Sequence, residues 1–104
     1  MRMVHATTTR AFWRILNKGI LADKARGPLK TVWLCSPGSM GRAIDHVKSR
    51  KRIKVTDVVV IEVEVPKRWL RKGNAKGFKH TDGRDIPRER IVSATTLRQL
   101  GGDD

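Results

Sequence analysis

Asp-Val-Val-Val-Ile-Glu-Val-Glu-Val, residues 57–65, is the stretch that decides the fold of this 104-residue chain. Its β-branched residues favour a strand, and side chains on a strand alternate between two faces. One face is apolar throughout, with Val59, Ile61, Val63 and Val65. The other face changes from valine to glutamate along its length. We therefore expect the start of that second face to be covered and its end to be open.

Upstream of this strand, the sequence predicts a strand followed directly by a helix. Residues 2–6 favour a short strand, and apolar residues recur at helical spacing through residues 9–18. Thr8 or Thr9 is a suitable N-cap, and Gly19 is a suitable residue just beyond the end of the helix. The start of the chain is therefore predicted to form a strand and an amphipathic helix.

The remaining segments complete an α+β prediction. Residues 22–30 have loop composition, residues 31–35 favour a strand, and Ser39 can cap a second helix that ends near residues 48–52. Residues 90–97 favour a last strand. We predict a small mixed β-sheet with about two helices packed on it, in a single domain over residues 1–98, followed by a disordered tail at 99–104.

The composition points to polyanionic partners. Lys and Arg total 23 against 10 Asp and Glu, which gives a formal charge of +13. Such an excess attracts nucleic acid, although it also serves general solubility. The single cysteine, Cys35, excludes an internal disulfide and a paired-cysteine zinc site, so no metal is expected. The chain lacks an 18-residue apolar stretch and an apolar signal core, so we expect a cytoplasmic protein without a membrane span.

His5 and Thr7 are the first candidates for ligand binding. They are two residues apart on the predicted first strand and therefore share a face. A histidine can bond a sugar hydroxyl or phosphate through one ring nitrogen while a neighbour holds the other. The alternative interpretation is a structural histidine in the sheet, and two residues alone do not decide between them.

Two basic segments are candidates for nucleic-acid binding. The first follows the second predicted helix, and the second surrounds a tryptophan. Their members are Lys48, Arg50, Lys51, Arg52 and Lys54, then Arg68, Trp69, Arg71 and Lys72. Arginine forks suit phosphate, and an aromatic ring beside cations suits an exposed base. The alternatives are cations that complement the helix dipole, and a tryptophan packed in the core with solvated charges around it.

Glu62 and Glu64 share one face of the long strand. In a cleft such a pair could orient a ribose hydroxyl or act as a general base. Opposite basic neighbours it would instead form surface ion pairs. Glu89 lies between two arginines, which favours a surface ion pair. The chain has no Walker loop, GxGxxG, zinc spacing or G-x-S-x-G.

The order of several short motifs resembles the ADP-ribosyltransferase-like superfamily, and most closely the catalytic lobe of the NAD-dependent RNA 2′-phosphotransferases. The matching segments span residues 3–92. They are His5-Ala6-Thr7, the helix end Ile15–Ile20, the strand Val32-Trp33-Leu34, the helix end at Arg50, Gly77-Phe78, and the turn Ile86–Ile91. Where the family has His-Gly-Thr and a second histidine, this chain has His-Ala-Thr and Trp33.

The resemblance implies a cofactor and a set of site residues. NAD would be bound through His5, Thr7, Trp33 and Ser36, and the catalytic candidates would be His5, Arg50 and Glu64. Some transferase branches use a late catalytic glutamate, and its matching position is open among Glu62, Glu64 and Glu89. The implied function is a small basic domain that binds NAD or nucleic-acid phosphate and acts on a nucleic acid, as an NAD-dependent transferase. The residues leave two alternatives open: a non-catalytic nucleic-acid-binding module, and an accessory or inhibitor protein with a protein partner in a nucleoprotein complex.

Overall fold

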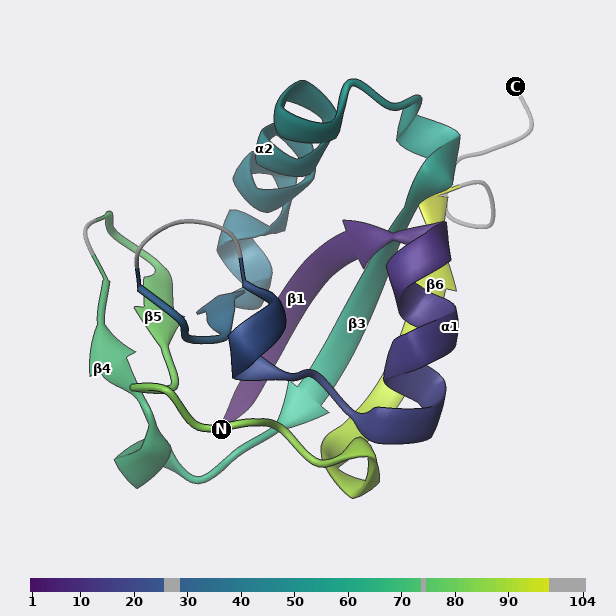
Figure 1. Ribbon diagram of the computed structural model, residues 1–104. Helices are drawn as coiled ribbons and strands as arrows, with labels where there is room; N and C mark the ends of the chain where they lie inside the picture. The colour runs from purple at the N-terminus through teal and green to yellow at the C-terminus, as the bar shows by residue number, and fades with distance from the viewer. Residues whose placement is uncertain (26–28, 74, 98–104) are drawn as a thin grey trace.

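The computed structural model describes residues 1–25, 29–73 and 75–97. It is an α+β fold with one six-stranded sheet and two helices, as predicted (Figure 1). The strands lie in the order β4-β5-β2-β1-β3-β6, and every pair is antiparallel, whereas the sequence predicted a mixed sheet. Strand direction depends on how distant segments pair, which the pattern within one segment does not report. The tail predicted at 99–104 lies outside the described residues.

The elements agree closely with the predicted segments near the start of the chain and in the long strand. The strands are β1 (Arg2–Thr8), β2 (Trp33–Cys35), β3 (Val58–Glu64), β4 (Arg71–Lys72), β5 (Phe78–His80) and β6 (Ile91–Thr96). The helices are α1 (Thr9–Lys18) and α2 (Met40–Lys51). Five 3₁₀ turns join them within the described residues: η1 (Ala22–Lys24), η2 (Pro37–Ser39), η3 (Val55–Asp57), η4 (Lys67–Trp69) and η5 (Arg88–Arg90).

The two faces of β3 explain the position of both helices. Val59, Ile61 and Val63 belong to the larger apolar cluster, into which α1 packs Ile15. Val60, on the opposite face, belongs to a smaller cluster that α2 covers with residues including Ala43. The alternation of β3 therefore places α1 and α2 on opposite faces of the sheet.

The acidic end of β3 is open, as its changing pattern predicts. Glu62 and Glu64 both accept hydrogen bonds from the Arg2 guanidinium on the neighbouring strand, at 3.0 and 3.1 Å. Both carboxylates are substantially exposed. These contacts agree with the surface ion-pair interpretation of the two glutamates.

The ends of α1 follow from two residues. The Thr8 hydroxyl accepts a hydrogen bond from the Ala11 backbone N–H at 3.1 Å, so Thr8 is the N-cap. Gly19 ends the helix with a φ of +79°, and its N–H donates to the carbonyl of Ile15. Its Cα lies so close to the backbone of Ile86 that a side chain would overlap that carbonyl.

Ser39 occupies the N-cap position of α2, as predicted, but its side chain does not bond a backbone N–H of the helix. Its hydroxyl lies 3.3 Å from the hydroxyl of Ser36 instead of accepting a helix N–H. Ser36 and Ser39 both lie in the turn before the helix, and the close approach of Gly77 confines the Ser39 side chain there. At the other end, Arg52 adopts the left-handed conformation and closes α2.

The sheet is continuous but joined narrowly at its middle. All seven residues of β1 pair with β3, whereas within the described strands β1 and β2 share a single register pair, Val4 with Cys35. Beyond this pair the two strands separate. The half made of β6, β3 and β1 therefore meets the half made of β2, β5 and β4 at a split. None of the helices in the described ranges has the length and apolar character needed to cross a membrane.

Candidate functional site: a basic cleft at the split of the sheet

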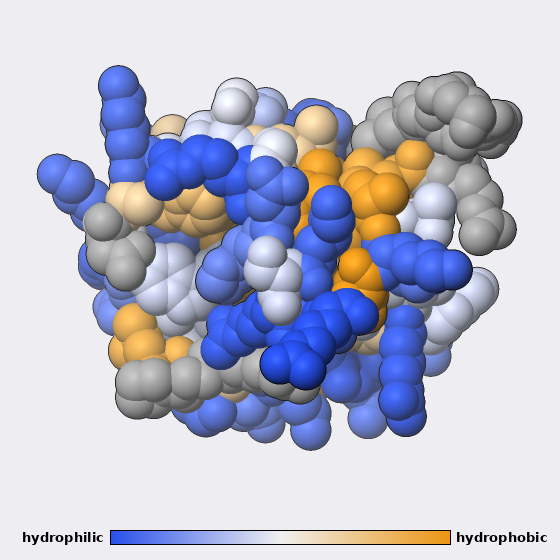
Figure 2. All heavy atoms as spheres, turned by 90° about the horizontal axis from the view of Figure 1, so that it is seen from above, coloured by the Kyte–Doolittle hydropathy of each residue, from blue (hydrophilic) through white to orange (hydrophobic). Residues whose placement is uncertain are grey.

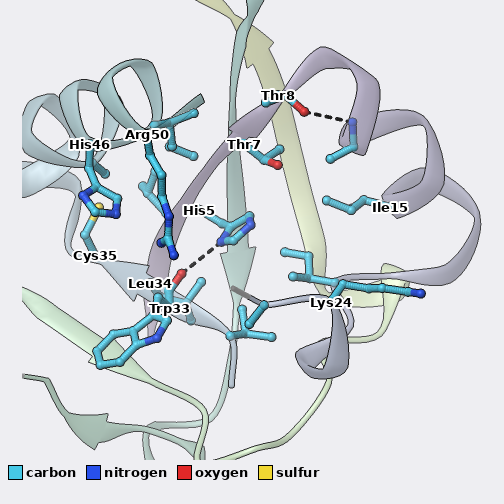
Figure 3. A pocket seen from close by; sticks show the side chains of 18 of the residues that line it. His5, Thr7, Thr8, Ile15, Lys24, Trp33, Leu34, Cys35, His46 and Arg50 are labelled. Atoms are coloured by element: carbon cyan, nitrogen blue, oxygen red, sulfur yellow. Dashed lines mark hydrogen bonds between the residues drawn. The ribbon is translucent and has the colours of Figure 1, made fainter. Parts of the chain in front are cut away.

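A cleft of about 580 Å³ lies where β1 and β2 separate. Because the sheet is split there, side chains from both helices reach the same space. The lining comes mainly from β1, α1, β2 and α2, with further residues from η1 and the chain around it, from the segment before β2, and from Ala75 and from Phe78 of β5. Figure 3 shows this cleft with α2 on one side and α1 on the other.

The lining of the cleft is strongly basic. It includes five lysine and arginine side chains and two histidines: Arg14, Lys24, Arg42, Arg50, Lys51, His5 and His46. None of the lining residues in the described part of the chain is Asp or Glu. Cations that gather around one cleft repel one another, and a bound anion relieves that repulsion. The cleft therefore suits an anionic ligand.

His5 bridges the split in the sheet. Its Nδ1 lies 2.9 Å from the carbonyl oxygen of Trp33 on β2. A carbonyl only accepts, so Nδ1 carries the hydrogen, and in the neutral ring Nε2 remains an acceptor. Burial lowers the pKa of His5, and the hydrogen bond to Trp33 opposes that shift only in part. The ring is therefore held in one tautomer that presents an acceptor.

Arg50 reaches into the cleft from the last turns of α2. In Figure 3 its side chain extends toward His5 and the carbonyl of Trp33. Thr7 lies on the same strand as His5 and also lines the cleft. The structure thus places His5, Thr7, Trp33 and Arg50 around one cleft, although His5 and Arg50 are 45 positions apart in the sequence. These are four of the residues that the family resemblance implied.

Ser36 and Glu64, the other two residues implied by the resemblance, lie elsewhere. Ser36 follows β2 but does not line the cleft, and its hydroxyl is bonded to Ser39. Glu64 is the last residue of β3, whereas Arg50 lies near the end of α2, from which the chain leads to the start of β3. Hydrogen bonds from Arg2 and the Met1 amino group hold the pKa of Glu64 below its ordinary value. No glutamate accompanies His5 and Arg50 among the described lining residues.

The basic end of α2 divides into two groups. Arg50 and Lys51 line the cleft, whereas Lys48, Arg52 and Lys54 do not. Figure 2 views this end of the molecule and shows hydrophilic side chains over much of it, with an apolar area between them. Outside the cleft, Arg52 and Lys54 are exposed to solvent and Lys48 is partly buried.

Trp69 packs against the larger apolar cluster, as the core interpretation predicts. Two arginines lie over its ring: Arg84 at 4.7 Å and Arg90 at 5.2 Å from the ring centroid. Arg68, Arg71 and Lys72 are exposed around it. The ring therefore already has cationic partners within the protein, and the neighbouring charges lie at the surface.

Sequence reasoning missed Arg14, Lys24 and Arg42 as lining residues. A signal for one of them was present: Arg42, His46 and Arg50 are four residues apart on α2 and therefore lie along one side of the helix. The positions of Arg14 and Lys24 depend on how α1 and η1 pack over the split. No pattern within those segments reports that packing.

A search against models of known protein families finds no match for this chain, and a search of curated proteins finds no significant match. Within the described ranges, no three His, Cys, Asp or Glu side chains are grouped so that they could hold a metal ion.

Proposed function

We propose that the chain binds the phosphates of a nucleotide in the cleft between α1 and α2, with NAD as the ligand. The observation that carries this proposal is the lining: five lysine and arginine side chains, two histidines and no carboxylate among the described residues. Arginine and lysine donors match phosphate oxygens, and the cleft volume of about 580 Å³ is within the usual range for small-molecule sites.

His5 and Arg50 have complementary roles in this proposal. Arg50 donates to phosphate, and the neutral Nε2 of His5 accepts a hydrogen bond from a ribose hydroxyl. The hydrogen bond from Nδ1 to Trp33 supports that orientation, because it directs the acceptor nitrogen away from β2. The resemblance to the NAD-dependent RNA 2′-phosphotransferases, which rests on the same residues, favours NAD over other nucleotides.

The lining also favours one kind of reaction partner. A transferase that used a hydroxyl nucleophile would need a base. The described lining residues include no carboxylate, only His46 and His5, whose Nε2 is assigned here to a ribose hydroxyl. A phosphate nucleophile is already ionised and is attracted by the same cations. We therefore propose that any transfer of ADP-ribose is to a phosphorylated acceptor, such as a nucleic-acid phosphate.

A second candidate function is nucleic-acid binding without chemistry. The observation that favours it is the continuation of positive charge outside the cleft, at Lys48, Arg52 and Lys54. In this alternative the cleft holds one backbone phosphate and the surface cations hold its neighbours. His5→Ala would then leave binding intact, whereas the double change Arg50→Ala and Arg52→Ala would weaken it.

The proposal is tested by calorimetric titration with NAD and with ADP-ribose. We expect Arg50→Gln to weaken binding about tenfold or more, because hydrogen bonds between charged groups contribute about 1.5–3 kcal/mol. Arg10→Gln is the matched control, since Arg10 is an exposed arginine on α1 that does not line the cleft. Equal affinities for the wild type and both variants, or no binding by the wild type, would contradict the proposal.

A further inference from the structure

A second basic pocket of about 330 Å³ lies at the other side of the molecule. It is formed by η4, β4 and the turn at residues 81–84 that follows β5, at the lower left of Figure 1. Its lining is Arg68, Trp69, Arg71, Thr81, Asp82, Gly83 and Arg84, and it shares no residue with the cleft. Any ligand bound there is therefore held by a separate set of side chains.

Three arginines face this pocket with one carboxylate. Arg71 pairs with Asp82 at 3.7 Å, and neither Arg68 nor Arg84 has an ion-pair partner among those found in the described residues. The lining thus keeps an excess of positive charge. Guanidinium groups present planar pairs of N–H donors that match the oxygens of phosphate. The composition of the pocket favours a phosphate group as ligand.

Two of the arginines are held in position before any ligand binds. The Arg71 guanidinium donates to the carbonyl oxygens of Arg68 and Leu70, at 3.0 and 3.2 Å. Arg84 lies over the ring of Trp69, with its guanidinium carbon 4.7 Å from the centroid. Side chains that are already ordered lose less conformational entropy on binding.

The turn that carries Arg84 is also well ordered. Thr81 is buried, and its hydroxyl donates to the carbonyl of Arg84 at 2.6 Å. The N–H of Gly83 donates to the hydroxyl of Thr31 at 3.0 Å, which ties the turn to the segment before β2. The base of the pocket is therefore fixed to the sheet, and the arginines project from a rigid support.

We propose that this pocket binds a backbone phosphate of single-stranded nucleic acid and does not read the base. Trp69 orients Arg84 instead of stacking on a base, because its ring packs on the core and already lies beneath Arg84 and Arg90. Contacts to phosphate position a strand without recognising its sequence. A flexible strand can meet this pocket whether or not it also enters the cleft.

The chain offers a matched pair of variants for the test. Arg84 and Arg90 both lie over Trp69, but only Arg84 lines the pocket. Arg84→Gln and Arg90→Gln remove the same charge and the same kind of ring contact. Arg68→Gln is a second test variant that does not alter Trp69, since no ring contact joins the two. Melting temperatures establish that each variant is folded.

Binding of a fluorescent dT20 strand is measured at several salt concentrations. For Arg84→Gln and Arg68→Gln we expect weaker binding and a plot of log affinity against log salt that is shallower by about 0.7, which corresponds to one lost phosphate contact on a single strand. Arg90→Gln should keep the wild-type slope. Equal slopes for Arg84→Gln and Arg90→Gln would overturn the proposal.

Two further measurements separate this proposal from others. A 20-residue abasic strand should bind with the affinity of dT20, and a large loss would show that the site reads bases. Titration with ADP-ribose should give the same affinity for Arg84→Gln as for the wild type. A loss of ADP-ribose binding in Arg84→Gln would show that the two sites are not separate, whereas failure of the cleft proposal alone leaves the dT20 result unaffected.

Discussion

His5 lies where the two halves of the sheet separate, and its environment decides its chemistry. β1 and β2 share one backbone register pair, Val4 with Cys35. Beyond it, the Nδ1 of His5 donates a hydrogen bond to the carbonyl of Trp33 and so links the two strands through a side chain. Burial disfavours the charged ring more than the hydrogen bond to Trp33 favours it, so the pKa of His5 is lowered. His5 therefore stays neutral at pH values at which an exposed histidine already begins to bind a proton.

The lowered pKa of His5 predicts how stability depends on pH. Between the ordinary histidine pKa of 6.5 and the lower value in the folded chain, the unfolded chain binds more protons. The free energy of unfolding therefore decreases as pH falls below about 6.5. We expect wild type to lose more thermal stability between pH 8 and pH 5 than His5→Asn, whose amide can replace the bond from Nδ1. Melting curves across this range test the expectation, and identical losses would contradict it.

At the scale of elements, α1 is positioned by its two ends. Thr8 starts the helix at the edge of the cleft, and Gly19 stops it where the chain turns back to pair Ile20 with Ile86. Between these ends, Ile15 reaches the core and Arg14 reaches the cleft. The position of Arg14 in the cleft therefore depends on both ends of the helix.

Gly19→Ala tests this arrangement. The φ of +79° is a conformation that residues with a Cβ rarely adopt, and the new methyl group would meet the backbone of Ile86 and Arg88. We expect a loss of about 2 kcal/mol or more in the free energy of unfolding, measured by urea denaturation. Gly38→Ala is the control, because nothing lies within 4 Å of its added Cβ and its backbone is ordinary. Equal stabilities of the two variants would contradict this account.

The whole molecule combines a split sheet with a large positive charge. Both halves of the sheet contribute strand residues to the cleft, and each helix contributes cations from its own face. A net charge of +13 on a molecule 40 Å in its longest dimension also raises the local concentration of polyanions. The proposed nucleotide binding in the cleft and the proposed nucleic-acid binding on the surface are therefore compatible with each other.

A transfer assay tests catalysis by the whole molecule. The protein is incubated with labelled NAD and two RNA strands of one sequence, of which one carries a 2′-phosphate. We expect label to move to the phosphorylated strand alone, because the cleft offers cations and no carboxylate among its described residues. Arg50→Gln should lose this activity. The absence of label transfer, together with no NAD-induced rise in melting temperature, would contradict the transferase proposal.

Much of the fold was predictable because its strongest signals are local. The alternation of residues 57–65 predicted β3, its covered valines and its exposed glutamates. The apolar spacing of residues 9–18 predicted α1, and the helix has these same bounds. The short strands were less predictable. Residues 78–80 form a strand only because β2 lies beside them, and residues 71–72 only because residues 78–80 do. Two or three residues carry no period of their own.

The candidate site was predictable in part. His5, Thr7, Trp33 and Arg50 were associated by their order along the chain, and they do line one cleft. Ser36 and Glu64 were further candidates, but the turn after β2 and the far end of β3 hold them outside the cleft. Order along a chain indicates which elements are neighbours. It does not indicate which end of a strand faces a given helix.

The sequence by itself determined the α+β class, the long central strand, the first helix and the positive charge, because each depends on residues close together in the chain. Only the tertiary structure decided that every strand pair is antiparallel, that β1 and β2 separate beyond one pair, and that cations from two opposite faces meet at that opening. The physical reason is that pairing and packing between distant segments are settled by the whole core at once, whereas periodicity records only which face of each segment is apolar.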